Sequence, residues 1–259
     1  MPRANRYLLP GYTYHLTHRC HNRSFLFRFA KDRTEYSRRL RTAVRAFDVS
    51  LLTFCVTSNH THLLARAATP EQISALMQKL EGEFAEYYNI RKKRSGAFWE
   101  GRYHCTMIED GVHLWNCMRY IDLNMVRAGI VEHPSEWSWC GYRELTGIRQ
   151  RYRMLDVAEI LGRFGGASRE KFGAYCQEVI GDALRRCQLS REAIWTESIA
   201  VGSESFVNQI GEETRNRRKL SYEALPGNQW VVRETPTRYG SFSGRKNGSK
   251  PQCETRHEG

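Results

Sequence analysis

Residues 49–65 read VSLLTFCVTSNHTHLLA and contain two apolar runs separated by a short polar turn. The first run, Val49–Thr57, is rich in the residue types that favour strands. The second, His60–Ala65, begins directly after Ser58 and Asn59. Two such runs joined so closely predict an antiparallel pair of strands. The fold is therefore expected to contain a sheet with hairpin-like joins.

Helical patterns flank this pair of strands. Asp32 with Glu35 forms a capping-box pattern at one helix start, and Thr69 before Pro70 forms another helix start. The expected elements in chain order are a strand at 12–20, a helix at 32–47, strands at 49–57 and 60–65, a helix at 69–94, a strand at 97–108 and a helix at 112–124. This mixture predicts an α+β fold with helices packed on a mainly antiparallel sheet.

The rest of the chain has a different pattern. Helical spacing recurs beyond residue 150, at 155–163, 169–187, 190–195 and 203–216, whereas the last twenty residues are rich in Gly, Ser, Lys and Arg. The 259 residues are therefore divided into an α+β domain at 1–150, a helical region at 151–220 and a basic tail at 221–259, which is expected to be disordered.

Composition and charge narrow the class of protein. Hydrophobic residues make up 41% and charged residues 26%, which excludes wholesale disorder. No apolar run approaches the roughly 18 residues of a membrane helix, so we expect a cytoplasmic protein without a membrane partner. The net charge of +12 is uneven, since residues 1–50 carry 11 basic and 3 acidic side chains and the basic and acidic side chains of residues 51–210 balance. Basic ends on a neutral middle are typical of a protein that binds nucleic acid.

The eight cysteines are scattered and include no CxxC pair. This spacing excludes a zinc finger, and in a chain of this kind it favours small buried hydrophobic side chains over a disulfide framework.

Two groups of histidines are candidates for chemistry. In a strand, His60 and His62 lie on one face and could share a divalent metal, although two hydrogen-bonded histidines would give the same pattern. The second group comprises His15, His18, Cys20 and His21. Strand alternation would separate His15 from His18, so this group favours hydrogen-bonding or DNA-facing roles.

A third candidate is the pair of Tyr120 and Asn124. Their i, i+4 spacing places both on one helical face. On spacing alone, the favoured interpretation is an amphipathic helix with a half-buried tyrosine.

Together these segments resemble the single-tyrosine HUH transposases of bacteria, and most closely the REP-associated tyrosine transposases. The resemblance spans about residues 1–150 and is carried, in order, by Pro2-Arg3, Pro10-Gly11, Tyr14-His15 and Arg19, by Thr57–Leu64, by Arg102-Tyr103, by Tyr120-Ile121, Asn124 and Val126–Gly129, and by Trp137-Ser138 and Tyr142. Two positions depart from the family pattern. Thr61 replaces a hydrophobic residue between the histidines, and Met125 replaces a proline, which could let the helix run further.

The resemblance implies a ferredoxin-like catalytic domain of the HUH endonuclease type. It implies metal-dependent cleavage and strand transfer on single-stranded or hairpin DNA, resembling repetitive extragenic palindromes. Tyr120 would form a 5′-phosphotyrosine link, and His60, His62 and Asn124 would hold Mg²⁺ or Mn²⁺. The expected DNA contacts are Arg3, Arg6, Arg19, Arg23, Arg102 and Arg127, with Phe98, Trp99 and Tyr103 as stacking surfaces if they are not core residues. The protein is expected on the bacterial nucleoid, as a monomer or homodimer.

Two other functions would also account for this charge pattern. One is a sequence-specific DNA-binding protein that has lost catalysis, and the other is an RNA-binding or RNA-processing module. The presence of His60, His62, Tyr120 and Asn124 together favours the enzyme.

Overall fold

The computed structural model describes residues 7–214 and 219–235. The strands are β1 (Thr13–Arg19), β2 (Ser50–Val56), β3 (His60–Arg66), β4 (His104–Ile108), β5 (Ala200–Gly202), β6 (Leu220–Leu225) and β7 (Gln229–Glu234). The helices are α1 (Ala30–Ala46), α2 (Pro70–Lys92), α3 (Val112–Asp122), α4 (Asn124–Arg127), α5 (Tyr142–Leu145), α6 (Val157–Arg163), α7 (Arg169–Arg185), α8 (Ile194–Glu197) and α9 (Glu204–Thr214), with 3₁₀ turns at His21–Arg23 and Pro134–Glu136.

In the described part of the chain, seven strands form one sheet in the order β2-β3-β1-β4-β5-β7-β6. The first four strands alternate with helices as β1-α1-β2-β3-α2-β4, and these four strands pair with one another in antiparallel fashion. This is the ferredoxin-like arrangement. The predicted α+β fold is confirmed, and the apolar runs at 49–65 are the paired strands β2 and β3.

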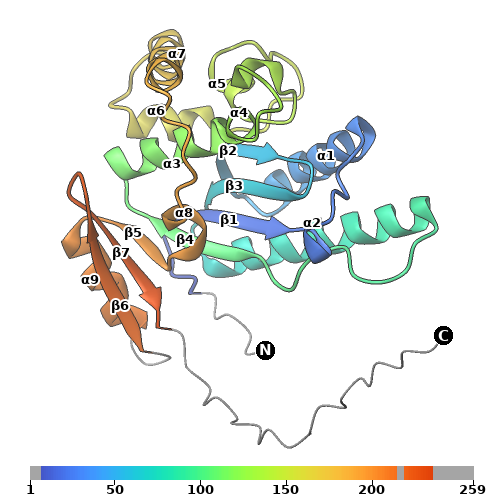
Figure 1. The fold of residues 1–259 in the computed structure, drawn as a ribbon, viewed down its shortest axis with the longest axis horizontal. Coiled ribbons are helices and arrows are strands. Elements are labelled where there is room, and N and C mark those ends of the chain that lie inside the picture. Colours follow the sequence, from blue (N-terminus) through green and yellow to red (C-terminus); the bar gives the residue numbers. More distant parts are fainter. Residues whose placement is uncertain (1–6, 215–218, 236–259) are drawn as a thin grey trace, which may run out of the picture.

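The alternation of side chains along β1 separates two faces of the sheet. On one face, His18 of β1 contacts Glu81 of α2, which also accepts a hydrogen bond from Tyr36 of α1. On the other face, His15 lies 2.7 Å from the carbonyl oxygen of Trp195 in α8. Helices α1 and α2 therefore cover one face, and α3 and α8 lie over the other (Figure 1).

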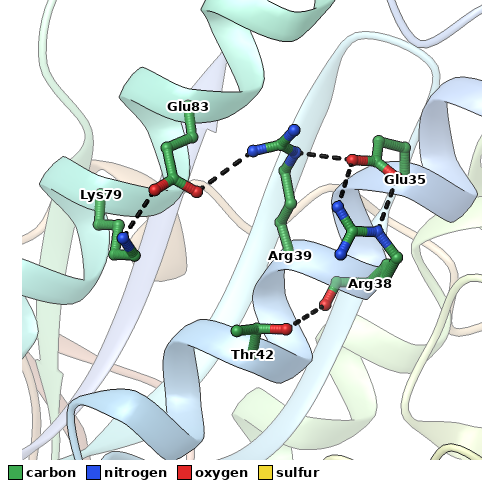
Figure 2. Close-up of polar contacts among 6 residues, drawn as sticks. All are labelled: Glu35, Arg38, Arg39, Thr42, Lys79 and Glu83. Carbon is green, nitrogen blue, oxygen red and sulfur yellow. Dashed lines mark hydrogen bonds and ion pairs between the residues drawn. The ribbon is translucent and has the colours of Figure 1, made fainter.

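Helices α1 and α2 pack side by side and are also joined by charged side chains at their surface (Figure 2). Arg39 of α1 bridges Glu35 at 2.8 Å and Glu83 of α2 at 3.2 Å, and Lys79 pairs with Glu83 at 2.7 Å. Such exposed pairs contribute at most about 1 kcal/mol each. The buried apolar stripe of α2, which includes Ile73, therefore supplies most of the stability of this layer.

Two predicted boundaries are wrong. Helix α1 begins at Ala30, and Asp32 does not cap it but lies buried in a salt bridge with Arg91 of α2. The strand expected from residue 97 begins at His104, because Gly101 has a φ of 70° that breaks the extended backbone. The capped start of α2 at Thr69 is confirmed.

The C-terminal part is not only helical. β5 pairs in parallel with β4, and β7 pairs with β5 and β6, so that the sheet continues past the ferredoxin-like unit (Figure 1). Residues 220–234 thus form a hairpin, although 221–234 were assigned above to a disordered tail. Its turn at Asn228 and β5, only three residues long, leave too short a pattern for recognition in the sequence. Residues 236–259 of the predicted tail lie outside the described residues.

Five of the cysteines are buried, and no disulfide joins cysteines within residues 7–214. This agrees with their expected role as small apolar side chains. No helix within the described ranges has both the length and the apolar character needed to cross a membrane.

Candidate functional site

A cleft of about 770 Å³ opens on the face of the sheet that carries α3 and α8. It is lined by β1, β3, the segment before β4, α3, α4 and α8. The lining residues are Thr17, His18, Arg19, Arg23, Asn59, His60, His62, Glu100, Arg102, His104, Tyr120, Asn124, Arg127, Ala128, Arg191, Thr196 and Glu197. The predicted histidines, tyrosine and asparagine are therefore brought together in one cleft.

His60 and His62 project from the same face of β3, with ring centroids 4.7 Å apart. The Nδ1 atom of His60 lies 2.7 Å from Oδ1 of Asn59, an oxygen that can only accept a hydrogen bond. His60 therefore carries its proton on Nδ1 and has its lone pair on Nε2. Burial lowers the pKa of His60 to about 4 and that of His62 well below its usual value, so both rings are neutral at pH 7.

His62 lies between two partners. Its Nδ1 atom is 2.9 Å from Nε2 of His15 on the adjacent strand β1, and its Nε2 atom is 2.9 Å from Nδ2 of Asn124. His15 is fully buried and hydrogen-bonded. This agrees with the hydrogen-bonding role, one of the two roles expected for its group. Its partnership with His62 could not be read from the sequence, because strand register decides which residues face each other.

Tyr120 lies near the end of α3, with its ring centroid 6.1 Å from that of His62. The guanidinium of Arg127 stands over the tyrosine ring, 4.2 Å from its centre. Burial raises the pKa of Tyr120, and the positive charges of Arg127 and Arg191 partly oppose that shift. The tyrosine comes from the same chain as the histidines beside it.

The helix that carries Tyr120 does not run further at Met125. α3 ends at Asp122, and after Leu123 the short helix α4 begins with Asn124. The side chain of Met125 is buried in the core. Asn124 still reaches His62, so the missing proline has not displaced the amide from the cleft.

The arginines expected to contact DNA converge on this cleft. Arg19, Arg23, Arg102 and Arg127 line it, whereas Arg3 and Arg6 lie outside the described residues. Arg191, which was not among the expected DNA contacts, also lines the cleft and pairs with Glu197 at 2.7 Å. No local motif marks Arg191, because the segment before α8, in which it lies, reaches the cleft only through the tertiary fold.

The three aromatic side chains considered as stacking surfaces belong to the core. Phe98, Trp99 and Tyr103 are 2%, 9% and 6% exposed. Trp99 stacks on His18 and donates a hydrogen bond to the carbonyl oxygen of Glu81. Their apolar rings fill the space under the α1–α2 face, which removes them from contact with a bound strand.

The residues of the cleft fit a divalent cation. Metal-binding histidines typically donate one N–H to a protein acceptor and coordinate through the other nitrogen, and His60 has this arrangement. The amide of Asn124 can rotate to present Oδ1 in place of Nδ2, since the two ends are nearly equal in shape. No group of three or more His, Cys, Asp or Glu side chains in residues 7–214 and 219–235 is arranged to hold a metal. The amide of Asn124, 2.9 Å from Nε2 of His62, is an additional donor group beside the two histidines.

Comparison with known proteins finds similarity to transposases. Residues 9–124 match the family described as "Transposase IS200 like". One similar solved structure is a REP-associated tyrosine transposase bound to a REP hairpin, with 18% identity, a TM-score of 0.49 and coverage of 61% of this chain and 93% of the other. Another is a candidate transposase from Deinococcus radiodurans R1, with 18% identity, a TM-score of 0.33 and coverage of 50% and 96%. No curated protein sequence matches the chain significantly. Residues 9–124, which hold His60, His62, Tyr120 and Asn124, are thus similar to the IS200-like transposases.

Proposed function

We propose that this protein is a divalent-cation-dependent endonuclease and strand transferase for single-stranded or hairpin DNA. One observation supports the proposal above all. Tyr120 lies in the same arginine-lined cleft as the proposed cation ligands His60, His62 and Asn124. Such a protein would work on chromosomal DNA in the cytoplasm.

The cleft provides the groups that transesterification of DNA needs. The phenolic oxygen of Tyr120 attacks the scissile phosphorus, forms a 5′-phosphotyrosine bond and breaks the bond to the 3′ oxygen, which leaves as a 3′-OH after taking up a proton. A second 3′-OH can attack the phosphotyrosine and return the free phenol. Because the phosphotyrosine retains the energy of the cleaved bond, rejoining requires no ATP.

The side chains around Tyr120 favour this reaction electrostatically. Burial keeps the phenol protonated at neutral pH, so its proton must be lost as it attacks. Arg127 over the ring and Arg191 across the cleft stabilise negative charge as it develops on the phenolic oxygen and the phosphate. Arg19, Arg23 and Arg102 are placed to hold the flanking phosphates.

The proposed cofactor is Mg²⁺ or Mn²⁺, held by His60, His62 and Asn124. When bound, it would neutralise charge on the scissile phosphate. Because Tyr120 lies beside the histidines of its own chain, these catalytic groups meet within one chain, which supports a monomer that can act alone.

A covalent adduct tests the proposal. The full-length protein is incubated in Mn²⁺ with a library of single-stranded DNA hairpins, labelled at the 3′ end and varied in stem and flanking sequence. We expect a labelled protein–DNA adduct that survives denaturation, and its absence from the same library annealed to complementary strands. Opening a duplex costs about 1.4 kcal/mol per step, and a regular duplex leaves little room around the scissile phosphate.

The other functions give different outcomes. A DNA-binding protein without catalysis would retain the hairpins and form no adduct. An RNA module would prefer matched RNA hairpins. Equal adduct yields on single strands and duplexes would indicate a duplex-nicking enzyme.

A further inference from the structure

A chain of hydrogen bonds enters the cleft from a part of the protein beyond residue 124. It begins at the main-chain carbonyl of Trp195 in α8, passes through the ring of His15, then through the ring of His62, and ends at the side-chain amide of Asn124. The three bonds measure 2.7, 2.9 and 2.9 Å, and their side chains are buried.

The donor and acceptor of each bond follow from the first group in the series, the carbonyl oxygen of Trp195. The carbonyl oxygen of Trp195 can only accept, so Nδ1 of His15 carries a proton and donates it. His15 is completely buried, and no carboxylate is among its contacts, so the ring is neutral and its Nε2 atom is an acceptor. The proton between the two rings must therefore sit on Nδ1 of His62, which leaves the lone pair of His62 on Nε2.

We propose that the Trp195 carbonyl and His15 act as positioning groups that hold His62 in the tautomer whose Nε2 lone pair faces Asn124 and the cleft. The purpose of this arrangement rests on the proposed function, because a free Nε2 lone pair is what cation binding requires. His60 reaches the same tautomer through Asn59, which lies next to it in the sequence. His62 depends instead on α8, beyond the residues that match the transposase family.

The position of α8 explains how it can supply this carbonyl. The ring of Trp195 is 1% exposed and lies 6.2 Å from the ring of Tyr120. Thr106 of β4 donates to the carbonyls of Trp195 and Ser198 at 3.2 and 2.8 Å. The carbonyl of Trp195 is thus held from two sides, and the C-terminal region becomes a part of the site.

The tautomer can be measured directly in the metal-free, full-length protein. Long-range ¹H–¹⁵N NMR correlations distinguish a protonated ring nitrogen from one with a lone pair. We expect the wild-type protein to show a proton on Nδ1 of His62 and a lone pair on Nε2. A proton on Nε2 of His62 in the wild-type protein would overturn the proposal, whether or not any variant folds.

Two substitutions of His15 then separate positioning from packing. His15→Phe keeps a ring but removes both hydrogen-bonding atoms, so we expect a mixture of His62 tautomers and a loss of Mn²⁺ affinity of about 10-fold or more. His15→Gln retains a donor and an acceptor, and we expect Mn²⁺ affinity within about threefold of wild type. Unchanged tautomer and affinity in His15→Phe would contradict the proposal.

Thr106→Val is the matched control, because it removes the other side-chain donor to Trp195 and leaves His15 and His62 in place. We expect its Mn²⁺ affinity to remain near that of wild type. A loss equal to that of His15→Phe would show that the position of α8, rather than the His62 tautomer, controls binding. If the predicted tautomer and affinities are found but no DNA adduct forms, the proposed function fails and this inference stands.

Discussion

His15 and His18 lie three residues apart on β1, yet they face opposite sides of the sheet and have different partners. Both ring nitrogens of His18 face oxygen acceptors, Nδ1 the buried carboxylate of Glu81 and Nε2 the carbonyl of Gly101 at 3.2 Å. On the other side, His15 and His62 have neutral hydrogen-bond partners. Their series of hydrogen bonds leaves one lone pair on Nε2 of His62. Both nitrogens of His18 are thus engaged by fixed protein oxygens, whereas Nε2 of His62 meets only the side-chain amide of Asn124 at the cleft.

This contrast predicts that substitutions on the cleft face remove chemistry and leave stability nearly unchanged. The largest effect is expected for Tyr120→Phe, which removes only the phenolic oxygen and retains the ring under Arg127. We expect cleavage to fall by about 1,000-fold or more, with hairpin affinity and thermal stability close to wild type. Adduct assays and thermal denaturation check this. Tyr103→Phe is the control, and an adduct that persists in Tyr120→Phe would indicate another nucleophile.

His60→Ala and His62→Ala are the next test of the cleft face. Each should remove most Mn²⁺-dependent cleavage, and the double variant should be little worse than either single one, because groups that act as one unit give non-additive losses. Cleavage rates measured across a Mn²⁺ titration check this. A normal rate in either single variant would show that the cation site is elsewhere.

The opposite face should behave in the reverse way. Glu81→Leu leaves His18 buried without its carboxylate and removes the acceptor of the Tyr36 hydroxyl. We expect the free energy of unfolding to fall by about 3 kcal/mol. Mn²⁺ affinity of the folded protein should stay within about threefold of wild type. Denaturant unfolding and Mn²⁺ titration give the two values, and a large loss of affinity with intact stability would break the contrast between the faces.

A pH-dependent effect tests whether the contrast follows the faces of the sheet or the partners of individual residues. Asp122 of α3 is buried against Thr53 of β2, and burial raises the pKa of its carboxyl to about 7. Because this pKa is higher in the folded state, the folded protein binds the proton more tightly, and stability falls as pH rises from about 4 to 7. Asp122→Asn should lack this slope of at most about 1.4 kcal/mol per pH unit.

The measurement compares the free energies of unfolding of wild type and Asp122→Asn at several pH values. Taking the difference removes the opposite slope of the buried histidines, whose lowered pKa values cost stability as pH falls. Parallel curves for the two proteins would show that Asp122 ionises normally in the fold.

The local pattern of the sequence was enough to predict the first strands of the sheet and part of the candidate site. Period two along β3 placed His60 and His62 together, and helical spacing placed Tyr120 with Asn124, because both patterns depend only on backbone geometry. The roles of these residues in cleavage remain predictions. The same local reasoning was wrong at Asp32, where a cap pattern was overridden by a buried salt bridge to Arg91.

Only the tertiary structure decided which segments meet. Strand register pairs His62 with Thr17 and so places it diagonally beside His15. The path of the C-terminal region brings Trp195 and Arg191 to a cleft built mostly from residues before 130. Nothing near Trp195 in the sequence indicates this, since the relevant atom is a main-chain carbonyl that every residue possesses. The sequence by itself therefore determined the ferredoxin-like unit and the candidate ligands. The packing of distant segments determined which nitrogen of His62 is free to act, because hydrogen-bond partners, and not residue type, set a histidine tautomer.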